Sequence, residues 1–218
     1  MILSRGRRYI FIHIPKTGGT ALTLALESRA MRDDIILSDT PKGRKRRRRV
    51  QGINSAGRLW KHSRLSDLQG LATQEELESF FVVTMVRNPW DRLVSYYHWL
   101  RVQKFDHPAV HLARSLSFPA FLRAPAIAQS IANSPAASYV ALPDGREHCD
   151  CFIRLEHFAR DAAPFETHLG FPLSPLPVAN RSERARDWRV HYTDADAEIV
   201  ARICSADIAR FGYRFDPE

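Results

Sequence analysis

The chain has 218 residues, of which 44% are hydrophobic and 26% charged, and its net charge at pH 7 is +8. This length suits one large α/β core and is short for two ordinary domains, so we expect a single domain over residues 1–218. No apolar run approaches the roughly 18 residues of a transmembrane helix, and the N-terminus does not read as a signal peptide. Three cysteines are too few for a disulfide framework, and a CxC pair alone is not a zinc site. These features favour a reducing cytoplasm.

The first predicted strand leads into a loop that suits an anion. Residues 10–14 form a short β-branched and aromatic run, which Pro15 ends. Gly18 and Gly19 allow a tight turn, and a helix begins near Thr20. Unpaired N–H groups in its first turn, together with the helix dipole, attract phosphate or sulfate. An ordinary strand-to-helix turn is the alternative for a glycine pair alone.

The position of the lysine separates this loop from a Walker A loop. In the pattern GxxxxGK[ST] the lysine follows the last glycine, whereas here Lys16 precedes both glycines. This order disfavours a nucleotide kinase, which would also need magnesium. It is still compatible with a loop that binds a phosphate-like group.

A basic run follows a short strand predicted at residues 34–37. Residues 42–49, KGRKRRRR, contain seven basic residues and no acid, so the remainder carries 8 − 7 = +1. Such a run repels itself, and we expect a solvated, flexible insertion at 40–52. It is either a plain surface loop or a region that steers an anionic acceptor or membrane surface. A nucleic-acid site is disfavoured because no aromatic residues interleave with the charges.

A second motif lies at the end of another strand. Thr73 and Glu76 predict a capping box for a short helix before the buried strand 81–86. Arg87 ends that strand, and a helix is predicted from Pro89. Arg87 and Ser95 are near enough in sequence to converge on one anion.

The remaining elements complete an α/β pattern. Short helices are predicted over 108–141, where they would cover the mouth of the site, with a strand at 151–155 and a helix at 156–169. Thr193 and Asp196 predict the cap of a last helix that runs to about residue 210. Alternating strands and helices predict a central parallel sheet with helices on both faces, a three-layer α/β/α sandwich.

Two motifs carry a family resemblance. PKTGGT, at residues 15–20, resembles the 5′-phosphosulfate loop of sulfotransferases that use 3′-phosphoadenosine-5′-phosphosulfate (PAPS). Residues 87–97 resemble the family's 3′-phosphate motif, commonly RDPxxRxxSxY, with Asn88 in place of the usual aspartate. Residues 152–161, 176–186 and 211–215 are similar to bacterial members of the sulfotransferase type 2 family. The resemblance implies the P-loop NTPase-like sulfotransferase fold and a PAPS-dependent enzyme.

The resemblance also implies roles for individual residues. Lys16 would stabilise the bridging and sulfuryl oxygens, and the loop would bind the 5′-phosphosulfate through Lys16, Thr17, Gly18, Gly19, Thr20 and Ala21. The 3′-phosphate would be held by Arg87 and Ser95, while Arg181 and Ser182 would close over the nucleotide. The product is adenosine 3′,5′-bisphosphate, and no metal is expected.

A base must take the proton of the acceptor hydroxyl, and His62 is our candidate. It resembles the KH segment that precedes the second motif in this family, and a histidine with a pKa near 6.5 can be neutral and still accept a proton. A surface histidine among basic neighbours is the alternative. His13 is expected to pack beside its strand. The resemblance favours a sugar hydroxyl on a glycan or glycoconjugate as acceptor, in the cytoplasm, with peripheral membrane association left open. A phosphate- or nucleic-acid-binding module and a kinase-like protein are the alternative functions.

Overall fold

The computed structural model describes residues 1–179, 185 and 187–216. These residues form two compact units, the first made of residues 1–86 and 136–179 and the second of residues 87–135, 185 and 187–216.

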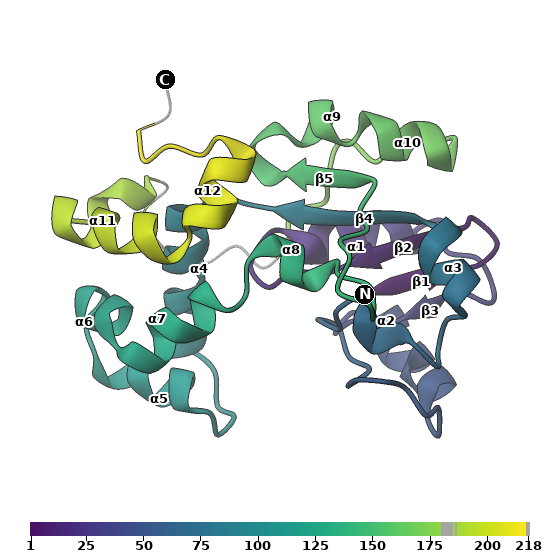
Figure 1. The fold of residues 1–218 in the computed structure, drawn as a ribbon, viewed down its shortest axis with the longest axis horizontal. Coiled ribbons are helices and arrows are strands. Elements are labelled where there is room, and N and C mark those ends of the chain that lie inside the picture. Colours follow the sequence, from purple (N-terminus) through teal and green to yellow (C-terminus); the bar gives the residue numbers. More distant parts are fainter. Residues whose placement is uncertain (180–184, 186, 217–218) are drawn as a thin grey trace. The chain divides into compact units, whose positions relative to one another are not determined.

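The first unit is built on a five-stranded sheet with the strand order β3-β1-β2-β4-β5 (Figure 1). Strands β2 (Tyr9–Ile12), β4 (Phe81–Val86) and β5 (Cys151–Arg154) are parallel, with Ile10 opposite Val82 and Thr84 opposite Phe152. The predicted strands therefore form the parallel core of an α/β sheet.

One edge of the sheet differs from the prediction. Strand β1 (Ile2–Ser4) was not expected, and it runs antiparallel to both β2 and β3 (Ile35–Ile36). The reason is a tight turn in which Arg8 N donates to Arg5 O at 3.2 Å, since a hairpin returns the chain antiparallel. The sheet is therefore mixed: its central strands are parallel, as predicted, and the antiparallel edge was not foreseen.

Both faces of the sheet are covered. On one face, Val83 and Met85 pack in a cluster with Leu22 of α1 (Gly19–Glu27) and Phe165 of α10 (Ala163–Leu169). Val82 points to the other face, because side chains alternate along a strand, and it is also fully buried. A second layer must cover that face, which agrees with the predicted sandwich.

The second unit is helical, and its core is formed around α4 (Pro89–Arg101). The apolar stripe that the sequence places on this helix is buried, including Leu93 and Tyr97. Trp90 Nε1 donates to Ala197 O at 3.0 Å, and Tyr97 donates its hydroxyl to Leu116 O at 2.8 Å. Other helices of this unit are α5 (Pro108–Ser115), α6 (Phe118–Arg123), α7 (Pro125–Ala132), α11 (Asp194–Ile203) and α12 (Ser205–Phe211).

The predicted capping box at the start of α3 (Gln74–Ser79) is present, and the predicted cap of α11 is also a capping box. The prediction of short helices over 108–141 is confirmed by α5, α6, α7 and α8 (Ala136–Tyr139).

Two of the predicted helices are shorter than expected. The helix expected over 156–169 is divided into η3 (Leu155–His157), α9 (Phe158–Asp161) and α10. Pro164 explains the break before α10, because proline is tolerated only in the first turn of a helix. The last predicted helix breaks at Cys204, which separates α11 from α12.

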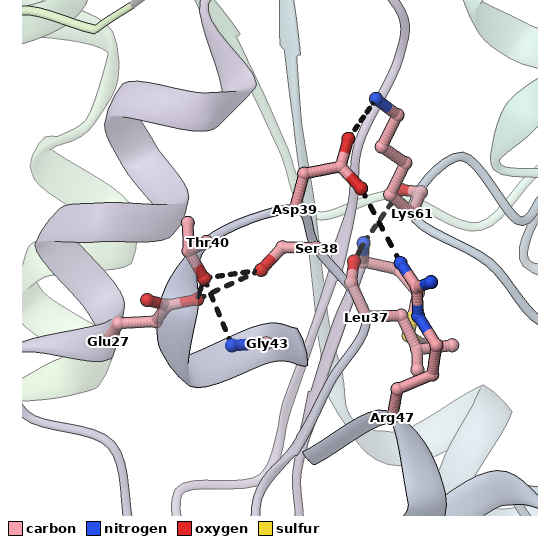
Figure 2. A network of polar contacts seen from close by, with 9 residues as sticks. Glu27, Leu37, Ser38, Asp39, Thr40, Gly43, Arg47 and Lys61 are labelled. Carbon is pink, nitrogen blue, oxygen red and sulfur yellow. Dashed lines mark hydrogen bonds and ion pairs between the residues drawn. The ribbon is translucent and has the colours of Figure 1, made fainter. Parts of the chain in front are cut away.

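The basic run is helical, so the prediction of a loop there was wrong. It forms α2 (Pro41–Arg46) and the 3₁₀ helix η1 (Arg47–Val50). Thr40 caps α2 by accepting from Gly43 N at 3.0 Å, and its hydroxyl also donates to Glu27 Oε1 at 2.5 Å (Figure 2). Pro41 occupies the first turn, where proline favours a helix.

Three cations of the run are engaged by backbone carbonyl groups, which reduces the repulsion expected from sequence. Lys42 Nζ donates to Glu27 O, near the end of α1, where the helix dipole is negative. Arg46 Nη1 and Arg49 Nη1 both donate to Asp34 O, at 3.0 Å and 2.6 Å.

Among the described residues, no helix combines the length and apolar character that crossing a bilayer requires.

Candidate active site

The predicted anion loop follows β2 and leads into α1. Lys16 has φ +67° and Gly18 has φ +88°, so both have the left-handed backbone conformation. Backbone turns of this kind gather N–H groups into concavities that bind anions. Gly18 is the N-cap of α1 and has no side chain to cap the first turn. This backbone geometry is one that can accommodate an anion such as phosphate or sulfate.

Space restricts both glycines, and backbone conformation restricts Gly18 as well. A Cβ on Gly18 would lie 2.8 Å from Leu155 Cδ1, and one on Gly19 would lie 2.2 Å from His13 Cδ2. Contacts under about 3 Å force neighbouring atoms to move. The loop is thus packed directly against the side chains of Leu155 and His13.

Lys16 is the unusual residue of the loop. A residue other than glycine with positive φ is uncommon, and such strain is concentrated at functional sites. Its neighbour Thr17 is buried and donates its hydroxyl to Ile14 O at 2.8 Å, so the Thr17 side chain holds the loop. Lys16 and Thr20 are partly exposed.

His62 lies beside this loop through its contact with His13. Its Nδ1 is 2.7 Å from His13 O, and because a carbonyl only accepts, Nδ1 must carry the proton. Nε2 of the neutral ring is then the unprotonated nitrogen. The two imidazole rings meet edge to face at 4.7 Å, and the Trp60 ring lies 5.0 Å from that of His62.

Burial keeps both imidazole rings neutral. It lowers the pKa of His62 to about 3, against a smaller raising effect from the hydrogen bond to His13 O. Burial also lowers the pKa of His13 well below its usual value, and the neighbouring His62 adds to this effect. At pH 7 the Nε2 lone pair of His62 is therefore available to accept a proton, and an anion bound nearby would strengthen it as a base.

Three consecutive carbonyl groups at the exit of β2 are held by side-chain donors. Thr84 donates its hydroxyl to Ile12 O at 2.7 Å, and His62 and Thr17 donate to the next two carbonyl groups, those of His13 and Ile14. The candidate base and the loop are therefore attached to the same short stretch of backbone.

The second predicted motif begins the other unit. Arg87 donates from Nε and Nη2 to Asp91 Oδ2, at 2.8 Å and 2.6 Å, and its side chain is 14% exposed. Asn88 accepts from Trp90 N at 3.1 Å as N-cap of α4 and donates from Nδ2 to Arg214 O at 3.0 Å. Ser95 is buried on α4. Asn88 therefore performs the capping role for which the usual aspartate is also suited.

The predicted site residues lie in both units. Residues 16–21 and His62 belong to the first unit, where His13 brings His62 next to the loop, whereas Arg87 and Ser95 belong to the second. Arg181 and Ser182 lie outside the described residues. In the described ranges, no group of three or more His, Cys, Asp and Glu side chains could hold a metal ion.

Sequence reasoning missed two residues of this site. His13 was expected only to pack beside its strand, but its ring touches Gly19 and its carbonyl group orients His62. Trp60 was not singled out, although its place two residues before the candidate base was the available signal.

Comparison with known proteins identifies the family. The sequence profile described as "Sulfotransferase family" matches residues 1–214. The chain belongs to the sulfotransferase family. It is therefore an enzyme of the transferase class, and the predicted family is confirmed.

A solved sulfotransferase supports the fold. The crystal structure of mouse sulfotransferase SULT7A1 complexed with PAP is similar over 94% of this chain and 86% of that chain, with a TM-score of 0.50 and 16% sequence identity. At this identity the likeness shows that the two share the sulfotransferase fold. No curated protein sequence matches the chain significantly.

Proposed function

We propose that this sulfotransferase moves the sulfuryl group of PAPS to a hydroxyl group of a carbohydrate. The observation that carries the proposal is the loop at residues 15–20, where left-handed Lys16 and Gly18 precede an uncapped helix N-terminus. The PAP bound in the mouse sulfotransferase structure supports PAPS as the donor, and the family resemblance of the sequence supports a sugar as the acceptor.

The loop residues fit the 5′-phosphosulfate of the donor. Backbone N–H groups of residues 17–20 would donate to its oxygens, with the partly exposed hydroxyl of Thr20 as a further donor. The N–H of Ala21 donates to Gly18 O at 2.9 Å, so Ala21 would line the loop without donating to the ligand. The ammonium group of Lys16 would stabilise the negative charge that develops on the bridging oxygen. Positioning and charge stabilisation are the protein's main tasks in this reaction, as they are in phosphoryl transfer.

His62 would act as the base. A bond forms between the acceptor oxygen and sulfur while the bond from sulfur to the bridging oxygen breaks. The acceptor proton passes to Nε2 of His62, and adenosine 3′,5′-bisphosphate leaves. The hydrogen bond to His13 O supports this role because it holds the proton of neutral His62 on Nδ1.

Arg87 and Ser95 would bind the 3′-phosphate, with Arg181 and Ser182 closing over the nucleotide. The ion pair with Asp91 supports this assignment, because it holds the guanidinium group of Arg87 in one orientation at the start of α4. The planar guanidinium group can pair with a phosphate through two hydrogen bonds.

A thermal-shift comparison tests the donor site. Adenosine 3′,5′-bisphosphate at about 100 times its dissociation constant should add roughly 2.7 kcal/mol to the free energy of unfolding, whereas ATP with magnesium should add little. Stabilisation by ATP and magnesium, with none by the bisphosphate, would contradict the proposal.

A further inference from the structure

We propose that His13 is a further residue of the donor site, whose Nε2–H group donates a hydrogen bond to a sulfuryl oxygen of PAPS. This inference rests on the proposed function, because it concerns the group that is transferred. Three features of the first unit carry it: a buried imidazole ring that the described residues leave without a hydrogen bond, its contact with the anion loop, and its contact with the candidate base.

The His13 ring is buried without a polar partner. The residue is 6% exposed, and its Nδ1 atom has no hydrogen-bond partner among the described residues. Nor does Nε2 form a hydrogen bond with another residue in the described part of the chain. Buried polar groups are nearly always hydrogen-bonded, and an exception needs a reason such as a role in catalysis or in binding an ion.

The proton of this ring belongs on Nε2. Burial lowers the pKa of His13 well below its usual value, and His62 and nearby cations, Lys16 among them, lower it further, so the ring is neutral and carries one proton. Nδ1 is fully enclosed and meets no acceptor. Because an orphaned buried N–H group is rarer than an orphaned acceptor, the proton is more stable on Nε2. His13 is therefore an uncharged donor.

Nε2 lies on the edge of the ring that meets the anion loop. A Cβ on Gly19 would lie 2.5 Å from Nε2 and 2.2 Å from Cδ2, so this edge packs on the first residue of α1. The ring of Phe11, two residues earlier on β2, stacks with that of His13 at 5.8 Å and 19°, which fixes its orientation. The donor atom is thus held at the helix start that is assigned to the 5′-phosphosulfate.

The reaction geometry places the sulfuryl group beside this ring. In an in-line transfer, sulfur lies between the bridging oxygen of the phosphate, which the loop holds, and the acceptor oxygen, whose proton passes to His62. The His13 ring contacts both ends of that line, because it packs against Gly19 and meets the His62 ring edge to face at 4.7 Å. A donor at this place reaches the transferred group.

A neutral donor suits the oxygens of the sulfuryl group. They carry negative charge, and a hydrogen bond from Nε2 would hold them while sulfur passes from the bridging oxygen to the acceptor oxygen. His13 keeps its proton throughout, and the acceptor proton still passes to His62. The charge of Lys16 remains available to the bridging oxygen.

Two amide substitutions at position 13 test the donor atom. The amide nitrogen of glutamine reaches about as far from the backbone as Nε2, and that of asparagine about as far as Nδ1. Calorimetry gives the affinities of the full chain for PAPS and for adenosine 3′,5′-bisphosphate, which lacks the sulfuryl group. His13→Asn should shift the ratio of the two affinities about ten- to hundredfold in favour of the bisphosphate, the effect of one hydrogen bond to a charged group. His13→Gln should keep most of the wild-type ratio.

Two further variants separate this contact from packing. His13→Phe keeps an aromatic ring but no nitrogen, and it should shift the ratio as His13→Asn does. His168→Asn is the matched control, because it removes an exposed imidazole of the same unit whose Nε2 lies 2.8 Å from Arg7 O, and it should leave the ratio unchanged. Melting temperatures show whether each variant is folded.

Two results would overturn the inference alone. One is an equal loss of affinity for PAPS and for the bisphosphate in all three variants at position 13, which would mean that the ring only supports the loop. The other is slower single-turnover transfer with an unchanged affinity ratio, which would make His13 a positioning residue for His62. A wild-type chain that binds neither nucleotide would contradict the proposed function itself, and the inference with it.

Discussion

At the scale of single residues, Lys16 combines a charge with a strained backbone. Its φ of +67° is a conformation that glycine adopts freely and lysine does not. The fold tolerates this cost at a position where a glycine would be easier to accommodate. The strained backbone is thus retained for the sake of the lysine side chain. Mutation can separate the effect of the charge on activity from the effect of the backbone conformation on stability.

We expect Lys16→Ala to stay folded and to lose about 2.7 to 4 kcal/mol of transition-state stabilisation, the usual loss for one preorganised group. Lys16→Gly should lose as much activity while being at least as stable as the alanine variant, because it relieves the strain. Single-turnover rates with PAPS and melting temperatures measure the two effects. Near-normal turnover in either variant would remove Lys16 from its proposed role.

Gly19 is the second residue whose identity has a specific reason. A Cβ there would lie 2.2 Å from Cδ2 and 2.5 Å from Nε2 of the buried His13 ring. Gly19→Ala should therefore displace His13, cost about 1 to 3 kcal/mol of stability through overpacking, and lower the rate by disturbing His62. Chemical denaturation and turnover measure both effects. The double variant Gly19→Ala/His13→Ala, which frees the space, should recover part of the stability; no recovery would contradict this explanation.

At the scale of secondary-structure elements, strands and helices next to strong signals were predictable. Strand β4 and the start of α4 follow from an apolar run that ends at Asn88 and Pro89. The basic run shows why other elements were not. Its helicity depends on hydrogen-bond acceptors of Glu27 and Asp34, which lie outside the run. The local sequence shows only the repulsion between the charges and gives no sign of these acceptors.

The cap of α2 provides a test of that explanation. Thr40→Ala removes the acceptor of Gly43 N and one of the hydroxyl donors to the buried Glu27 carboxylate, leaving Ser38 at 3.0 Å (Figure 2). We expect a loss of about 0.5 to 2 kcal/mol in the free energy of unfolding. Thr40→Ser keeps both bonds and should be close to wild type. Equal losses in the two variants, measured by urea denaturation, would mean that packing of the methyl group matters more than the cap.

The start of α4 should contribute specificity for the 3′-phosphate. Arg87→Ala should weaken binding of adenosine 3′,5′-bisphosphate by roughly 2 to 5 kcal/mol, the usual loss for a buried charge pair. It should hardly affect adenosine 5′-phosphate, which lacks the 3′-phosphate. Isothermal titration with both ligands decides the matter, and equal losses for the two would assign Arg87 a structural role with Asp91.

At the scale of the whole molecule, the two buried histidines make stability depend on pH. Burial lowers the pKa of His62 to about 3 and that of His13 well below 6.5, so both are neutral in the fold but protonate when the chain unfolds in mild acid. The unfolded state then binds more protons, and stability must fall as pH drops from about 6.5 toward 3.

We expect His62→Asn to reduce this pH dependence. Each histidine contributes a slope of up to about 1.4 kcal/mol per pH unit in that window, and asparagine can donate to His13 O without titrating. Urea denaturation between pH 4.5 and 7.5 measures the slopes. Burial would raise the pKa of Asp161, but hydrogen bonds from Arg154 and Arg160 outweigh it and lower that pKa to about 2. Its stabilising effect is lost between about pH 5 and pH 1, so it adds little to the slope above pH 5. An unchanged slope in the variant would show that His62 is already protonated in the fold or does not gain a proton on unfolding.

The family and the parallel core were predictable because they depend on contiguous motifs. The antiparallel edge at β1 was not, since three residues carry no periodicity that separates a strand from a loop. The contact of His13 with His62 was not predictable either, because the two residues lie 49 positions apart and meet only where the chain returns. Trp60 lies two residues before His62, and that spacing was a signal in the sequence.

The exit of β2 leaves its carbonyl groups no freedom to shift. Ile12, His13 and Ile14 each present one carbonyl oxygen to a different partner, a strand threonine, the candidate base and a threonine of the anion loop. The three donors bind the carbonyl oxygens of successive peptide groups. Inserting or deleting a residue between positions 12 and 17 would therefore place a different carbonyl oxygen opposite each donor. A substitution at Ile12 or Ile14 that keeps a buried apolar side chain of similar volume would leave these backbone acceptors in place, whereas a change in the length of this segment would not. The geometry therefore constrains the number of residues between the strand and the loop as well as their identity.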